Sequence, residues 1–102
     1  MAIPRGSTPL HTFTLPVEAE SVRTVKITYA QDDTVVLAKK SPDVTVSGNK
    51  ASVRLTQEDT IRLDQEKRVQ IQVRVLTING DSLPSEIITT TVLCLLDDEV
   101  LT

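Results

Sequence analysis

The sequence predicts a single all-β domain, a small sandwich of about seven antiparallel strands. Three observations predict it. The 102 residues fit one domain and leave little room for two. Apolar residues alternate with polar ones over most of the chain, which is the period of a half-buried strand. Turn-forming residues separate these stretches at intervals of about 8–12 residues, a spacing typical of sandwiches and small barrels.

The clearest strand spans residues 68–77. Its apolar side chains all fall on one face and its polar side chains on the other, because side chains alternate along a strand. The apolar set is Val69, Ile71, Val73 and Val75, and the polar set is Arg68, Gln70, Gln72 and Arg74. Asn79-Gly80 follows it, a dipeptide that tolerates positive φ and favours a tight turn.

The same period predicts six further strands, over residues 10–15, 22–30, 34–40, 44–46, 51–55 and 86–93. The turns between them at residues 31–33 and 47–50 indicate two hairpins. A hairpin cannot bury one face alone, so the hairpins are expected to pack sheet on sheet. The architecture is therefore predicted to be immunoglobulin-like, although the Cys…Trp…Cys pattern of true immunoglobulin domains is absent.

One short helical turn is expected near residues 57–60. Thr56 can cap its N-terminus, and Asp59 stands at the position that completes a capping box. The segment is too short to be a stable helix by itself. We expect Ile61 and Leu63, just after it, to close one end of the core.

The two ends of the chain carry apolar residues outside the predicted strands. Residues 1–8 are expected to form an irregular N-terminal arm, and residues 95–102 a C-terminal tail. The candidate assembly contacts in these ends are Ile3, Leu95, Leu96, Val100 and Leu101. They could dock on a neighbouring copy, since exchanged arms and open sheet edges are common routes to oligomers. Alternatively, both ends could cover the sandwich's own edges, and the sequence leaves this choice open.

Composition excludes several classes of partner. The net charge is −3, whereas nucleic-acid binding predicts a basic excess. Phe13 and Tyr29 are the only aromatic residues, so rings on which a base or sugar could stack are almost lacking. No stretch approaches the roughly 20 apolar residues that span a bilayer, and no export signal is recognised. We therefore expect no nucleic acid, no membrane and no small-molecule substrate as partners.

No set of residues predicts catalysis, a cofactor or a metal site. His11 has no nucleophile at a known motif spacing and is interpreted as an ordinary polar residue at a strand edge. Cys94 lies between leucines and is interpreted as a small buried apolar residue. The acidic runs at residues 32–33 and 97–99 lack the ligand spacing of calcium loops, so we expect them to be solvated.

Four segments resemble a group of small proteins encoded among virion structural genes in prophages of Gram-positive gut bacteria and other Firmicutes. They are RGSTPLHTFTLP (5–16), VKITYAQDDTVVLAK (25–39), VRLTQEDTIRL (53–63) and QIQVRVLTINGDSLPSEIITTTV (70–92). The chain is also similar to N-terminal β-domains of phage baseplate and receptor-binding proteins. The resemblance covers nearly the whole chain and implies no catalytic residue.

The resemblance implies a structural or assembly protein of a tailed phage, in the tail or baseplate. Its partners would be other virion proteins and further copies of itself, and it would be made in the bacterial host cytoplasm before entering the virion. The alternative is a non-catalytic ligand-binding or adhesin-like β-sandwich module. The scarcity of aromatic residues makes a ligand pocket the weaker hypothesis.

Overall fold

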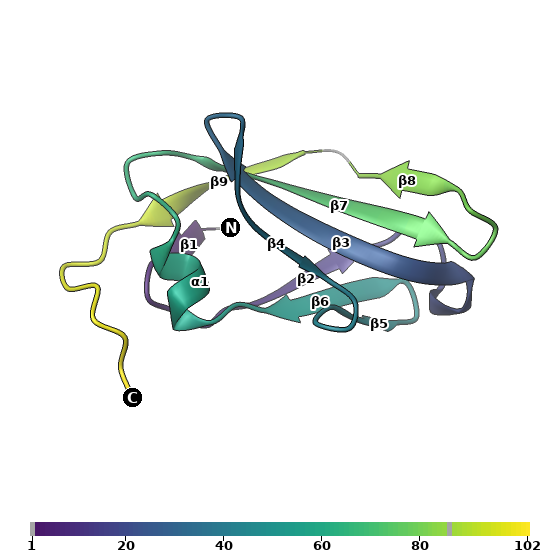
Figure 1. Cartoon of the computed structure of the whole chain (residues 1–102), viewed down its shortest axis with the longest axis horizontal. Coiled ribbons are helices and arrows are strands. Elements are labelled where there is room, and N and C mark those ends of the chain that lie inside the picture. Colours follow the sequence, from purple (N-terminus) through teal and green to yellow (C-terminus); the bar gives the residue numbers. More distant parts are fainter. Residues whose placement is uncertain (1, 86) are drawn as a thin grey trace.

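Two layers of strands enclose an apolar core, with one short helix at the end of the sandwich (Figure 1). The computed structural model describes residues 2–85 and 87–102. The elements are β1 (Ala2–Pro4), β2 (Leu10–Thr14), a 3₁₀ turn (Ala19–Ser21), β3 (Val22–Gln31), β4 (Thr34–Lys40), β5 (Thr45–Ser47), β6 (Lys50–Arg54), α1 (Gln57–Ile61), β7 (Val69–Thr77), β8 (Ser82–Pro84) and β9 (Ile88–Leu93). The fold is all-β, as predicted.

The strand order is that of an immunoglobulin-like sandwich. One sheet has the order β1-β9-β7-β3-β4, with β8 also paired to β7, and the other has the order β2-β6-β5. Counted along the chain, β2, β6 and β5 correspond to strands B, E and D of an immunoglobulin domain. The strands β3, β7 and β9 correspond to C, F and G, and β4 adds the neighbour of C that variable-type domains have.

The centre of the larger sheet is the antiparallel pair β3 and β7. Val25, Ile27 and Tyr29 lie opposite Val75, Val73 and Ile71 in register. All six side chains are buried, and the polar residues between them face outward or lie at intermediate depth. The alternation that predicted residues 68–77 as a strand therefore marks the inner face of the sheet, because a strand turns alternate side chains to opposite sides.

Two of the predicted turns adopt the backbone that their residues favour. Asp32 and Asp33 link β3 to β4 with φ of 50° and 60°. Both residues tolerate the left-handed region, which a two-residue hairpin turn needs at both positions. Gly80 has φ of 91° in the turn after β7, where a side chain would be strained.

The N-terminal segment is not wholly irregular, which corrects the prediction for residues 1–8. Ala2–Pro4 form β1, which runs parallel to β9 and pairs Ile3 with Val92. The expectation of purely antiparallel strands is wrong at this edge. A three-residue strand with a single apolar residue gives no periodic signal, and its partner lies at the other end of the chain.

The predicted strand over residues 86–93 begins later than expected, at Ile88, while Ser82–Pro84 pair separately with β7 as β8. Ser85, which follows β8, also bonds to β7. Its N–H donates to the Val73 carbonyl and its hydroxyl accepts from the Val73 N–H. Glu86 lies outside the described residues. The remaining predicted strands are found with their ends shifted by about one residue, as is usual for boundaries.

The core is aliphatic, with a few aromatic and polar side chains among it. Leu63 is fully buried at the end of the sandwich, as expected, whereas Ile61 is only half-buried. The buried apolar residues come from both sheets and from the segments beside α1: Ile3, Phe13, Leu15, Val25, Ile27, Tyr29, Leu37, Val44, Ala51, Val53, Leu55, Leu63, Val69, Ile71, Val73, Val75 and Val92.

Replacing Ile3 with Ala tests whether β1 belongs to the core. Ile3 is fully buried, so losing three carbons should lower the free energy of unfolding by about 2–4 kcal/mol. Leu10→Ala is the matched control, because Leu10 is half-exposed and should change stability by less than about 1 kcal/mol. Urea unfolding measures both. Equal losses for the two variants would contradict the packing of β1 against β9.

Candidate functional site

The C-terminal tail leaves β9 and runs past α1, outside both sheets (Figure 1). Hydrogen bonds at two points hold it to the body. The Leu95 N–H donates to Gln65 Oε1 at 3.1 Å. Further along, the Leu101 N–H donates to Gln57 Oε1 at 2.9 Å, and Gln57 Nε2 donates to the Leu101 carbonyl at 2.9 Å. The tail is therefore tethered at both of its ends, while the stretch between them faces solvent.

Four of the five predicted assembly residues lie together on this tail. Leu96 and Leu101 are exposed, while Leu95 and Val100 are half-buried. A hollow of about 220 Å³ separates the tail from α1 and is lined by Gly6, Gln57, Leu95, Asp97, Glu99 and Leu101. Leu95 packs closely on Gly6, where a Cβ atom would lie only 2.8 Å from Leu95 Cδ2. The absence of a side chain at residue 6 thus lets Leu95 approach the body.

Ile3, the fifth predicted residue, is separate from the tail surface. It is fully buried in the core of its own chain, through the pairing of β1 with β9. For this residue the structure corresponds to the alternative in which the chain end covers the sandwich's own edge. Ile3 is therefore not exposed to a partner, because three residues of strand suffice to bring it into the sheet.

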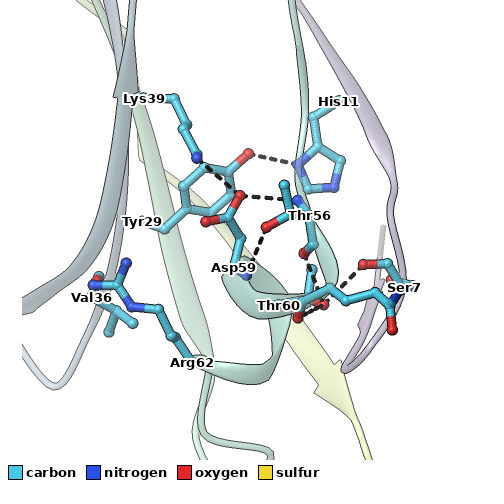
Figure 2. A network of polar contacts seen from close by, with 10 residues as sticks. Ser7, His11, Tyr29, Val36, Lys39, Thr56, Asp59, Thr60 and Arg62 are labelled. Atoms are coloured by element: carbon cyan, nitrogen blue, oxygen red, sulfur yellow. Dashed lines mark hydrogen bonds and ion pairs between the residues drawn. The ribbon is translucent and has the colours of Figure 1, made fainter. Parts of the chain in front are cut away.

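A polar network lies at the α1 end of the sandwich (Figure 2). Tyr29 Oη lies 2.6 Å from His11 Nδ1, which joins β3 of one sheet to β2 of the other. Close by, Lys39 Nζ forms an ion pair with Asp59 Oδ2 at 2.9 Å. The sequence pattern could not reveal this cluster, because its members come from four elements that are far apart in the chain.

The direction of the Tyr29–His11 hydrogen bond follows from burial. Burial, with a smaller effect from the nearby Asp59 carboxylate, raises the pKa of Tyr29 well above its usual value, so its hydroxyl stays protonated. Burial also lowers the pKa of His11, so the ring is neutral. Tyr29 therefore donates to Nδ1, and the proton of the imidazole lies on Nε2. Nε2 is buried and has no partner among the described residues.

Asp59 fixes the start of α1. Its N–H donates to Thr56 Oγ1 at 3.1 Å, and its carboxylate accepts from the Thr56 N–H at 2.9 Å, which is the predicted capping box. Burial alone would raise the pKa of Asp59, but the hydrogen bond from the Thr56 backbone and the Lys39 ammonium together hold it below its usual range. Asp59 is therefore a charged structural residue that ties α1 to β4.

Two candidate residues have environments that the sequence did not predict. His11 is buried against Tyr29 and Phe13, not placed as an ordinary polar residue at a strand edge. Cys94 is exposed, not buried, because β9 ends at Leu93 and the chain then leaves the sheet. The prediction that Cys94 is buried assumed that the strand continues through its leucine neighbours, and it does not.

Within residues 2–85 and 87–102, no group of three or more histidine, cysteine, aspartate or glutamate residues could hold a metal ion. No helix within the same residues is long and apolar enough to cross a membrane. Of the two acidic runs, the one at residues 32–33 is exposed in its turn, where Asp32 forms an ion pair with Lys67 at 2.8 Å.

The free edge of β4 is partly covered. The guanidinium of Arg62 donates to the carbonyl of Val36 (Figure 2). Lys39 and Lys40 end the strand, and charged residues at an edge hinder pairing with another chain. The C-terminal tail is thus more open to another chain than the free edge of β4.

The stability of the fold should depend on pH through His11. The folded chain binds a proton at His11 less readily than the unfolded chain, whose pKa is near 6.5. Stability is therefore full above this value and falls as pH decreases below it, by up to about 1.4 kcal/mol per pH unit. Urea unfolding between about pH 7.5 and about pH 5 measures this slope.

His11→Gln is the control for that slope, because an amide does not titrate in this range. Its unfolding free energy should be flat over the same interval. The contribution of Asp59 lies in a separate window, since its lowered pKa adds stability that is lost only as pH falls below the usual 3.8. An equal slope in wild type and His11→Gln would refute the assignment to His11.

Asp59→Ala should destabilise the domain by about 1–3 kcal/mol, because it removes the capping box and leaves the partly buried Lys39 without its partner. Glu58→Ala is the matched control, since Glu58 is the exposed neighbour on the same helical turn. Its effect should stay within about 0.5 kcal/mol. Thermal or urea unfolding compares the two. A similar loss for both variants would show that the cap matters little.

Few known proteins are similar to this chain. No family model and no curated protein matches it. Among solved structures, the V domain of amphioxus IgVJ-C2 is similar, with 17% identity and a TM-score of 0.39 over 92% of this chain and 100% of that chain. A match this weak carries no argument about function. The immunoglobulin-like architecture rests instead on the strand order of this chain.

Proposed function

We propose that this domain is a non-catalytic assembly module of a tailed-phage virion, in the tail or baseplate, which acts through protein–protein contacts. One observation carries the assembly part of the proposal. The end of the chain presents three exposed leucines, Leu93, Leu96 and Leu101, of which Leu101 lines the hollow against α1. Single exposed leucines are ordinary, but a group on one short segment favours a docking surface.

The free energy available from burying these leucines fits a weak contact that is repeated many times. Full burial of an exposed leucine contributes about 1.5–3 kcal/mol. Leu93 is only 48% exposed and Leu101 72%, so burying the rest of the three leucines would contribute about 3–7 kcal/mol before the cost of association. A micromolar complex needs about 8 kcal/mol net. The tail alone would therefore give a weak contact, which becomes strong when many identical copies bind at once, as in a virion.

The virion part of the proposal rests on the resemblance of four segments to prophage structural proteins. In this proposal the partners are further copies of the chain and other virion proteins. The protein would be made in the bacterial host cytoplasm and then incorporated into the particle. The outer surfaces of its sheets and the tail would be its working parts, and no pocket would be needed.

Leu96→Asp/Leu101→Asp tests the tail as the docking surface. Both side chains are exposed, so the fold should persist while the tail loses its apolar contact. Sedimentation velocity should show concentration-dependent association of the wild type that is at least about tenfold weaker in the variant, the equivalent of losing about 1.4 kcal/mol. Ile78→Asp is the control, because Ile78 is exposed in the turn after β7.

Virion membership is tested on particles. A prophage-carrying host that expresses the tagged wild type should release particles that contain the tag after density-gradient purification. The Leu96→Asp/Leu101→Asp chain should be depleted from them, while Ile78→Asp should be retained. Absence of the wild-type chain from purified particles would overturn the virion proposal.

A further inference from the structure

A row of three cations crosses the outer face of the larger sheet. In register, Lys26 on β3 lies opposite Lys40 on β4 and opposite Arg74 on β7. Lys40 and Arg74 are exposed, and Lys26 is half-buried between them. None of the three side chains has a hydrogen bond or ion pair with any residue in 2–85 or 87–102.

The row is costly for this chain by itself. Like charges directly opposite each other on neighbouring strands destabilise a sheet. Yet the strands of this sheet carry only basic charges, at Arg23, Lys26, Lys39, Lys40 and Arg74, in a chain whose net charge is −3. The acidic residues that the structure describes are placed in the loops, the turns, α1 and the tail. An anionic partner on the row would neutralise the repulsion.

The row lies in a shallow depression that can hold a chain segment. Its volume is about 250 Å³, and Thr24 and Leu76 line it beside the three cations. Thr24 and Leu76 are themselves register partners, next to the Lys26–Arg74 pair. The depression thus offers three positive charges, one hydroxyl and an apolar patch in one place.

We propose that this basic row, Lys40-Lys26-Arg74, binds the acidic stretch Asp97-Asp98-Glu99 in the tail of a second copy of the chain. The inference rests on the proposed function and names the partner of the tail. Three consecutive acidic residues match three cations in number. All three are exposed and stand between the two tethered ends of the tail. Asp97 Oδ1 accepts a hydrogen bond from the Glu99 N–H at 3.0 Å, which leaves its second oxygen and the other two carboxylates to meet another molecule.

The tail cannot reach the row of its own chain. Thr90 pairs with Val69, so Leu93 lies three residues beyond that pair and Arg74 five residues on its other side. At about 3.3 Å per residue, Leu93 and Arg74 are about 26 Å apart. A fully extended chain would carry the Cα atoms of residues 97–99 about 13–22 Å from Leu93. The hydrogen bonds of Leu95 to Gln65 and of Leu101 to Gln57 instead hold this stretch beside α1, away from the row.

The contact must therefore be made between copies, and it joins two different surfaces. Such a contact closes into a reciprocal twofold dimer or a larger ring, or continues as a filament, according to the rotation between copies. Because opposite charges make the contact, salt should weaken it.

Paired charge reversals test the contact. The first variant is Lys40→Glu/Arg74→Glu, which spares the half-buried Lys26, and the second is Asp97→Lys/Asp98→Lys. Each should associate with itself at least about tenfold more weakly than the wild type in sedimentation velocity at about 50 mM salt. An equimolar mixture should associate again, because each variant then supplies the surface that complements the other. Arg68→Glu, the reversal of an exposed cation that directly precedes β7 and lies outside the row, is the control and should behave as the wild type.

Three outcomes would overturn the inference. The first is a wild type that stays monomeric at low salt. The second is association that neither reversal changes, in which case the apolar tail and the virion proposal would still stand. The third is binding of a duplex DNA probe by the row, measured by fluorescence anisotropy. In this outcome Lys40→Glu/Arg74→Glu loses the DNA binding but associates with itself as the wild type does. Depletion of the chain from purified particles is read separately and tests only the proposed function.

Discussion

The hydrogen bond between Tyr29 and His11 is the polar contact on which the sandwich depends. Each sheet buries an almost entirely aliphatic face, and aliphatic contacts have no direction. The Tyr29–His11 bond adds one directional link between β3 and β2, at 2.6 Å. In antibody domains a tryptophan on the strand corresponding to β3 packs on a disulfide between the sheets. Here the ring on β3 bonds to the facing sheet instead.

The short segment around α1 organises both ends of the chain. Its first turn is fixed by the capping box and the Lys39–Asp59 ion pair. From there it holds the N-terminal segment and the tail through hydrogen bonds that include Arg5 to the Ile61 carbonyl, Thr60 to the Ser7 carbonyl, Gln65 to Leu95, and Gln57 to Leu101. A helix too short to be stable by itself is thus held in place by the polar groups around it.

Positive and negative charges lie on two different surfaces of this fold, which favours contact between unlike surfaces of two copies. The outer face of the larger sheet presents cations, while the tail at the α1 end presents carboxylates and leucines. Apolar contacts would supply most of the affinity, and opposite charges would select which surfaces meet. Two unlike surfaces on one small domain can pair reciprocally in a twofold dimer or link copies into rings and filaments, according to the rotation between copies.

The sequence by itself determined the elements whose signal is local. The alternation of Val69 to Val75, the Asp32-Asp33 and Asn79-Gly80 turns and the Thr56–Asp59 cap each depend on neighbours in the chain. The longer strands, the hairpins and the helical turn could therefore be predicted, whereas the three-residue strands β1 and β8 could not. Only the tertiary structure decided the position of Ile3, the Tyr29–His11 bond, the exposure of Cys94 and the row Lys40-Lys26-Arg74. These depend on which strands pair and in what register, and that is settled by contacts between residues far apart in sequence, which no local pattern encodes.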